Sequence, residues 1–103
     1  MCIRDREWLV SQQTRETAGL VGLADRGVVA PGYRADLNLI DQDQLGILAP
    51  EMVQDLPAGG TRYVQRATGY RATVCAGELT FRDGEPTGVL PGRLVRGAQP
   101  APA

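Results

Sequence analysis

Apolar residues occur along the chain in short runs separated by turn residues, a pattern typical of β structure. The clearest pair of runs lies within residues 24–41, where Val28-Val29 and Leu37–Ile40 flank the dipeptide Pro31-Gly32. Proline fixes φ at the value that the second position of a turn requires, and glycine accepts the positive φ that a type II turn needs next. The segment therefore predicts a strand, a tight turn and a second strand.

A second hairpin is predicted in the last third of the chain. Residues 70–76 alternate between two faces, Gly77-Glu78 marks a tight reversal, and residues 79–82 form the return strand. Asp83-Gly84 then closes that strand with another turn, and residues 62–66 begin a further extended piece.

Helical structure is expected mainly near the start of the chain. Residues 7–13 read as the end of a helix, and Thr14 suits the N-cap of a second short helix over residues 15–21, with Gly22 as its stop. Pro50 is placed to open one more helical turn through Val53. The fold class is therefore mainly β with a short N-terminal helical segment.

With 103 residues the chain forms at most one domain, which would bury roughly two-thirds of its unfolded surface around a modest core. Thirteen glycines and seven prolines favour short strands over long helices. Residues 1–6 fit nothing that follows and resemble a non-native leader translated from adapter sequence. The tail over residues 98–103 has too few apolar residues to pack, and we expect it to be disordered.

The charge balance excludes several classes of partner. Eleven basic and twelve acidic residues give a net charge of −1 without long blocks of one sign, so neither nucleic acid nor an anionic membrane surface is expected to bind. No apolar run approaches the roughly 18 residues of a membrane span, and no signal-peptide pattern opens the chain. We therefore expect a cytoplasmic protein.

The chain contains no histidine, which removes the commonest metal ligand and the commonest general base. Its two cysteines, Cys2 and Cys75, are too far apart in sequence for a CxxC-type metal pair. Cys75 alternates within a predicted strand, and we interpret it as a small buried apolar residue. A small hydrolase that uses Cys75 as its nucleophile is a weak alternative, because no histidine base is available.

Two loop-like motifs have an ordinary and a functional interpretation. Asp36, Asn38 and Asp41 superficially resemble a calcium loop, but Ile40 interrupts the ligand pattern, and we expect Asp36 to bind backbone amides of its own turn instead. Residues 58–61 contain two glycines but lack the lysine of a phosphate-binding loop, so they are interpreted as plain loop.

Two sets of charged side chains are interpreted as solvated surface. Exposed carboxylates are expected around a hairpin, and an acid–base pair would need burial that the pattern does not indicate. Clustered arginines on strands can meet an anion, but solvated strand edges explain them more simply. The acidic set is Glu78, Asp83 and Glu85, and the basic set is Arg62, Arg66 and Arg71.

Two long stretches closely resemble the C-terminal end of amidohydrolase family 3 enzymes, a group that includes D-aminoacylase, the N-acyl-D-amino-acid deacylase. They are TRETAGLVGLADRGVVAPGYRADLNLID and PEMVQDLPAGGTRYVQRATGYRATVCAGELTFRDGEPTGVLPGRLVRG. The resemblance runs from about Trp8 to Gln99. PGYRADLNLID is shared broadly among amidohydrolases, whereas DLPAGGTRYVQRATGY and AGELTFRDGEPTGVLPGRLVRG are more specific to the D-aminoacylase-like branch.

The resemblance implies a parent enzyme with a metal-dependent TIM barrel and a smaller β-sandwich built jointly from the first and last parts of the chain. Residues 7–23 would be the closing helical segment of the missing barrel, and residues 24–97 the C-terminal part of the composite sandwich. None of the family's catalytic, metal or cofactor-binding positions maps onto this chain. The parent would use a zinc-activated water to hydrolyse the acyl amide bond of an N-acyl amino acid.

Two functions of different classes follow. The chain is either a C-terminal fragment of such an amidohydrolase, inactive alone because the barrel is absent, or a free-standing β-rich structural or interaction module. In the first case its partners are the N-terminal strands and the barrel of the parent chain. A half-complete set of strands leaves unpaired edges and an uncovered apolar face, so we expect self-association or marginal folding.

Overall fold

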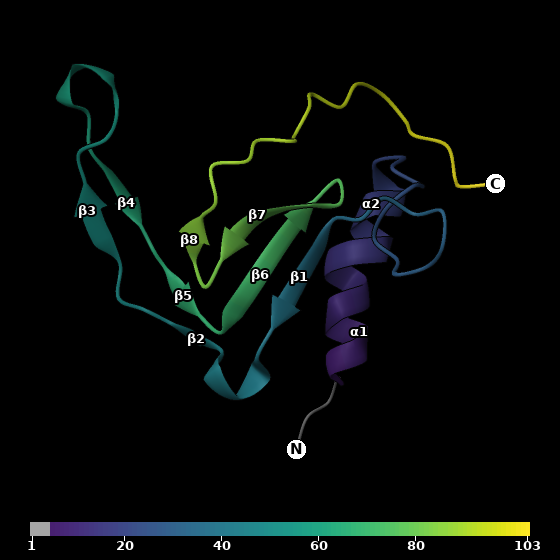
Figure 1. The fold of residues 1–103 in the computed structure, drawn as a ribbon, viewed down its shortest axis with the longest axis horizontal. Coiled ribbons are helices and arrows are strands. Elements are labelled where there is room, and N and C mark those ends of the chain that lie inside the picture. Colours follow the sequence, from purple (N-terminus) through teal and green to yellow (C-terminus); the bar gives the residue numbers. More distant parts are fainter. Residues whose placement is uncertain (1–4) are drawn as a thin grey trace. The chain divides into compact units, whose positions relative to one another are not determined.

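The computed structural model describes residues 5–103, so most of the leader expected at residues 1–6 lies outside the described residues. Helix α1 spans Arg6–Ser11 (Figure 1). Asp5 caps it, because its Oδ1 accepts a 2.8 Å hydrogen bond from the backbone N–H of Trp8. An aspartate at this position satisfies one of the N–H groups that the first helical turn leaves without an intrahelical partner.

The helix does not stop at Thr14. A π-helical turn over Gln12–Glu16 joins α1 to α2, which spans Thr17–Leu20. The expected N-cap at Thr14 is therefore wrong: the backbone is already helical there, and the Thr14 hydroxyl donates 2.7 Å to the carbonyl of Val10, one turn earlier.

The predicted helix stop at Gly22 is confirmed. Gly22 has a φ of 79°, and its N–H donates to the carbonyl of Gly19 at 3.1 Å, while the N–H of Leu23 donates to the carbonyl of Ala18 at 2.8 Å. These two bonds form a Schellman motif, in which a left-handed glycine turns the chain and satisfies the last carbonyls of the helix.

Only half of the first predicted hairpin forms. The turn is present, because Gly32 has a φ of 87° and the N–H of Tyr33 donates to the carbonyl of Ala30 at 3.2 Å. The strand predicted at Val28-Val29 is wrong: these residues belong to a loop whose base is closed by a 2.7 Å bond from the N–H of Arg34 to the carbonyl of Asp25. Two β-branched residues do not make a strand without a neighbouring strand to pair with.

The rest of the chain is mainly β, as expected. β1, β6, β7 and β8 form a four-stranded sheet in that order, and two smaller ladders pair β2 with β5 and β3 with β4. The short connections include two 3₁₀ turns, Gln42–Gln44 and Pro57–Gly59. The strands are β1 (Leu37–Ile40), β2 (Gly46–Ile47), β3 (Glu51–Val53), β4 (Arg62–Val64), β5 (Ala67–Thr68), β6 (Tyr70–Cys75), β7 (Glu78–Arg82) and β8 (Glu85–Pro86).

By internal contacts the chain divides into two units, each composed of several segments. The first contains the helical region, and the second contains the β2–β5 and β3–β4 ladders. Unit 1 comprises Met1–Leu37, Val74–Glu78 and Leu90–Ala103, and unit 2 comprises Asn38–Thr73 and Leu79–Val89.

Within unit 2, the ladders β2–β5 and β3–β4 follow one another along the same two chain segments and form an arm (Figure 1). The helical turn predicted from Pro50 to Val53 is wrong, because Glu51–Val53 is strand β3. Met52 lies directly opposite Tyr63 of β4, and this cross-strand pair supplies contacts that a single helical turn would not.

The second hairpin is confirmed with its turn one residue earlier than predicted. The turn consists of Ala76 and Gly77, with φ values of 53° and 84°, whereas Glu78 is already the first residue of β7. Positive φ at both central residues is typical of a type I′ turn, whose twist matches that of the flanking strands. The turn predicted at Asp83-Gly84 is present as well, with φ values of 50° and 83°.

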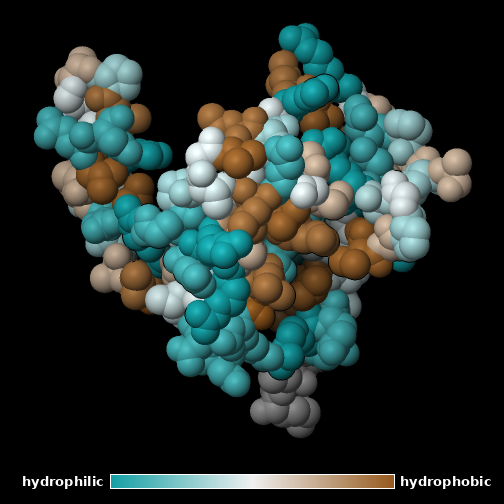
Figure 2. Space-filling view, in the orientation of Figure 1, coloured by the Kyte–Doolittle hydropathy of each residue, from teal (hydrophilic) through white to brown (hydrophobic). Residues whose placement is uncertain are grey.

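The modest core expected from the chain length is absent from the described part of the protein. None of residues 5–103 is buried, and Leu20, Val29 and Leu90 are 86%, 85% and 93% exposed. The accessible surface is 8458 Å², whereas a folded globular chain of this size would expose about 5,600 Å². Figure 2 shows the consequence directly, as apolar side chains at the surface.

The C-terminal segment differs from the expected disordered tail. Gln99 forms a parallel bridge with Leu23: its N–H donates to the carbonyl of Gly22 at 2.9 Å, and its carbonyl accepts from the N–H of Ala24 at 3.1 Å. Ala98 lies against Gly22, where an added Cβ would come within 3.1 Å of the Ala98 side chain. Two backbone hydrogen bonds therefore hold this segment beside the end of the helix.

Candidate functional site

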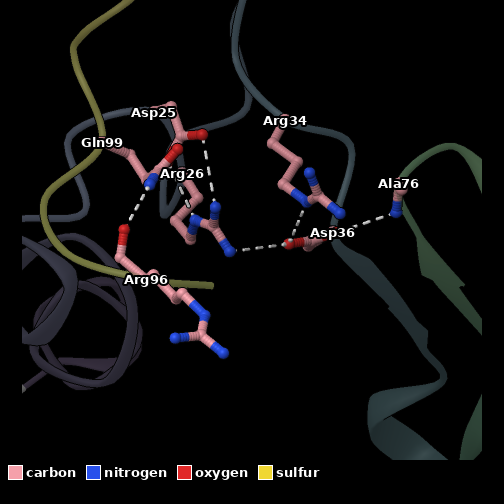
Figure 3. Close-up of polar contacts among 7 residues, drawn as sticks. All are labelled: Asp25, Arg26, Arg34, Asp36, Ala76, Arg96 and Gln99. Carbon is pink, nitrogen blue, oxygen red and sulfur yellow. Dashed lines mark hydrogen bonds and ion pairs between the residues drawn. The ribbon is translucent and has the colours of Figure 1, made fainter. Parts of the chain in front are cut away.

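The densest polar cluster of unit 1 is a chain of alternating charges at the base of the loop between Asp25 and Asp36 (Figure 3). Arg26 binds Asp25 through two contacts, Nε to Oδ1 at 2.9 Å and Nη2 to Oδ2 at 3.3 Å. Its Nη1 lies 3.8 Å from Oδ2 of Asp36, which is also 3.2 Å from Nε of Arg34. The four charges cancel, so the cluster leaves no net charge to attract a ligand.

The electrostatics of the cluster centre on the bidentate pair. The side-chain hydrogen bond from Arg26 lowers the pKa of Asp25, and the same bond raises the pKa of Arg26. The two side chains are 24% and 17% exposed, so water screens their attraction less than it would on an open surface. Arg34 adds an ion pair without a hydrogen bond, because its solvent-shielded Nε–H does not point at the carboxylate.

The carboxylate of Asp36 has a distant backbone partner. Its Oδ1 accepts a 2.8 Å hydrogen bond from the N–H of Ala76, at the tip of the β6–β7 hairpin (Figure 3). We expected Asp36 to bind amides of its own turn, and this expectation is wrong. Its carboxylate does bind a backbone amide, but that amide belongs to Ala76. Neighbouring residues in sequence carry no information about an acceptor forty positions away from its donor.

Within unit 2, Arg71 of β6 joins two acidic residues. Its Nη2 lies 3.1 Å from Oδ2 of Asp41, and its Nη1 lies 3.7 Å from Oδ1 of Asp83. The hydrogen bond to Asp41 raises the pKa of Arg71. Asp41, which is part of the superficial calcium-like pattern of the sequence, is thus the partner of an arginine.

The other two arginines of the predicted basic set also have acidic partners. Arg62 binds Asp55 through Nε at 2.8 Å and Nη2 at 2.6 Å, and this bond lowers the pKa of Asp55. Arg66 binds Glu51 at 3.1 Å across the arm. Because all three arginines are already paired with carboxylates, the geometry favours surface ion pairs over an anion site. The interpretation as solvated strand edges omitted these partners.

The remaining candidate residues are a cysteine, three carboxylates and a glycine-containing loop. Cys75 is a free, half-buried thiol rather than a fully buried one. Glu78, Asp83 and Glu85 are exposed, as expected, although only Asp83 lies in a turn, since Glu78 begins β7 and Glu85 begins β8. Residues 58–61 overlap the 3₁₀ turn Pro57–Gly59, and the carbonyl of Gly59 accepts a 3.1 Å hydrogen bond from Gln54 Nε2.

The described residues do not fit a metal centre. Over residues 5–103 no group of three or more histidine, cysteine, aspartate or glutamate side chains is placed to hold an ion. One hollow of unit 1, of about 490 Å³, is lined by Arg15, Glu16, Arg26 and Tyr33 among others. Arg26 is already paired with two carboxylates and Glu16 adjoins Arg15, so this hollow offers no concentrated charge.

Sequence reasoning missed the cluster around Asp36 and Arg26. A signal was present, because Asp25-Arg26 and Arg34–Asp36 place opposite charges at the two ends of one loop. Such a pattern indicates that the loop closes on itself, but it does not reveal the third element, the hairpin tip at Ala76.

Comparison with known proteins identifies the family. Residues 4–81 match the model of the amidohydrolase family, which covers most of the chain, and the chain therefore belongs to that family. Neither a curated protein nor a solved structure shows a significant match. The match ends at the last strand of the β6–β7 hairpin and includes the helical region, the arm and the Asp36 cluster.

A membrane-spanning helix is absent from the described part of the chain. None of the helices there is both long and apolar enough to cross a bilayer.

Proposed function

We propose that this chain is the C-terminal part of a D-aminoacylase-like amidohydrolase and supplies part of its accessory β domain. One observation carries the proposal: a chain that belongs to the amidohydrolase family buries no residue and offers no metal-ligand set over residues 5–103. A catalytic domain would need both a core and a site. In this proposal the barrel of the parent enzyme provides them, together with the ligands of any catalytic zinc.

The substrate class rests on the more specific of the two motifs. DLPAGGTRYVQRATGY, which resembles the D-aminoacylase-like branch, occupies residues 55–70 and includes strand β4 and the outer part of the arm. The parent would hydrolyse the acyl amide bond of an N-acyl-D-amino acid. Residues of this chain would position and cover the barrel rather than touch the reacting atoms.

A pair of chimeras tests the proposed subtype. Residues 7–99 replace the corresponding C-terminal segment of a characterised D-aminoacylase in one chimera and of a dihydroorotase in the other. We expect the first chimera to retain hydrolysis of N-acetyl-D-amino acids to within about tenfold, and the second to lose its native activity by a hundredfold or more. Equal loss in both chimeras would contradict the D-aminoacylase assignment.

The isolated chain provides the complementary test. With Zn²⁺ and N-acetyl-D-amino acids we expect no turnover above the buffer rate, because no group of three or more ligand side chains over residues 5–103 is placed to hold the ion. Turnover by the purified chain would contradict the proposal that the catalytic groups lie elsewhere in a parent protein. Sequencing the source DNA upstream of the Glu7 codon is the matching genetic test, and an open frame that encodes a barrel with histidine metal ligands is expected.

A further inference from the structure

The turn between β6 and β7 holds an alanine in a conformation that alanine disfavours. Ala76 has a φ of 53°, in the left-handed region, where a Cβ approaches the following carbonyl oxygen. This conformation is less favourable for an L-residue than a right-handed one. Because glycine and asparagine are the residues that type I′ turns prefer at this position, something outside the turn must favour the observed geometry.

Both central N–H groups of the turn are bound by the segment that precedes β1. The N–H of Ala76 donates to Asp36 Oδ1 at 2.8 Å, and the N–H of Gly77 donates to the carbonyl of Ala35 at 3.0 Å. Two successive amides that point the same way form a concave donor pair suited to an anion or a carbonyl oxygen. Here two neighbouring residues of the same chain fill that position.

The acceptor is itself held in place. While Oδ1 of Asp36 accepts from Ala76, Oδ2 lies beside the guanidinium groups of Arg34 and Arg26. Arg26 is fixed in turn by its bidentate contact with Asp25 (Figure 3). The carboxylate therefore reaches the turn with little rotational freedom left to lose.

We propose that Ala35 and Asp36 form a clasp that locks the tip of the β6–β7 hairpin, so that the hairpin tip and the loop between Asp25 and Asp36 move as one body. The hydrogen bond to Asp36 Oδ1 is the locking contact, and the two arginines orient the carboxylate that makes it. The clasp is a property of unit 1 and does not depend on the activity of a parent enzyme.

The chain carries its own matched control. The β7–β8 turn, Asp83-Gly84, has nearly the same φ values of 50° and 83°. Within the described residues, however, the N–H of Gly84 has no acceptor, whereas the N–H of Gly77 is bound to Ala35. The two turns therefore have the same backbone conformation, but only the β6–β7 turn is held by the clasp.

Amide hydrogen exchange, followed by NMR on the ¹⁵N-labelled full chain, tests the clasp directly. We expect the Gly77 amide to exchange at least tenfold more slowly than the Gly84 amide, after correction for intrinsic rates. Equal corrected rates at the two glycines, whether both slow or both fast, would overturn the proposal.

Two variants separate the hydrogen bond from the charge. Asp36→Asn keeps an acceptor oxygen for the N–H of Ala76 and removes the ion pairs, so we expect the Ala76 amide to keep its protection to within about threefold. Asp36→Ala removes both, and we expect protection of Ala76 to fall at least tenfold. Equal loss in the two variants would overturn the assignment of the hydrogen bond as the locking contact.

The Asp83 amide shows whether a variant has unfolded as a whole. It donates to the carbonyl of Arg71 at 2.9 Å and lies outside the clasp. In D36A we expect it to retain its protection. If Asp83 loses protection together with Ala76, D36A has unfolded as a whole and its result does not bear on the clasp. The wild-type comparison of Gly77 with Gly84 and the D36N result then decide the proposal.

Discussion

Gly27 lies directly against the helix backbone at Arg15. A Cβ added to Gly27 would come within 2.9 Å of both the Cα and the N of Arg15, and Gly27 has a φ of 88°. Both the close approach and the backbone angle therefore require glycine at this position. The contact lies at the π-helical turn, so the loop that contains Gly27 packs where the helix departs from regular geometry.

Gly27→Ala is expected to lower the free energy of unfolding by about 1–3 kcal/mol, because the methyl group overlaps backbone atoms that cannot move away. Thermal denaturation in the presence of an osmolyte such as TMAO, which strengthens the folded state, measures this loss. Gly19→Ala is the matched control: Gly19 lies in α2 with open space around it. Alanine there should be neutral or stabilising, and an equal loss in both variants would contradict the packing argument.

Ala76→Gly is expected to raise stability by about 0.5–1 kcal/mol, because glycine adopts a φ of 53° without strain. Ala72→Gly, in the middle of β6, should instead lower stability by a similar amount. Midpoints of urea unfolding measured side by side provide the comparison. A loss of stability in A76G would show that the turn is not strained.

Acid should weaken the loop base that contains Asp25. The hydrogen bond from Arg26 lowers the pKa of Asp25 in the folded chain below its ordinary value of 3.8. A lowered folded pKa means that the contribution to stability is complete above the unfolded pKa of about 4 and is lost as the pH falls through the folded value. The thermal midpoint should therefore decline below pH 4.

Asp25→Asn should flatten part of that acid decline, since it removes the titrating group. Asp43→Asn serves as the control, because the carboxylate of Asp43 forms no ion pair with a described residue. Thermal midpoints of the three chains between pH 2.5 and 7 give the measurement. Identical pH profiles for the wild type and D25N would contradict the assignment.

The uncovered apolar surface should make the purified chain associate. Leu20, Val29 and Leu90 are almost fully exposed, and large exposed apolar surface favours association. Sedimentation velocity over a hundredfold concentration range should show a rising mean mass, and the chain should bind a hydrophobic dye. A sharp, concentration-independent melt of a monomer would instead favour the free-standing module.

The sequence predicted best those features that one or two residues determine. Gly22 ends the helix and Pro31-Gly32 makes a turn because their backbone preferences act locally. The alternation over residues 70–76 predicted β6 correctly for a similar reason, since the side-chain period of two is a property of the segment itself.

The errors have a common physical cause, which is the choice of long-range partner. Glu51–Val53 forms a strand because Arg62–Val64 pairs with it, whereas Val28-Val29 is a loop that pairs with no described strand. The Asp36 cluster depends on the same kind of information, since its acceptor and the Ala76 amide are far apart in sequence. The wrong prediction of a core has the same cause, because chain length alone does not show which apolar faces will be covered.

The bridge between Leu23 and Gln99 also has a kinetic consequence. It joins two positions that are separated by most of the described chain, so its formation requires the closure of a very long loop. The entropy lost in that closure is offset by only two hydrogen bonds. Contacts of this kind form late in folding and open at the lowest free-energy cost once the protein has folded. We therefore expect a protease supplied in small amounts to remove the residues around Gln99 first and to leave the helix ahead of Gly22 intact.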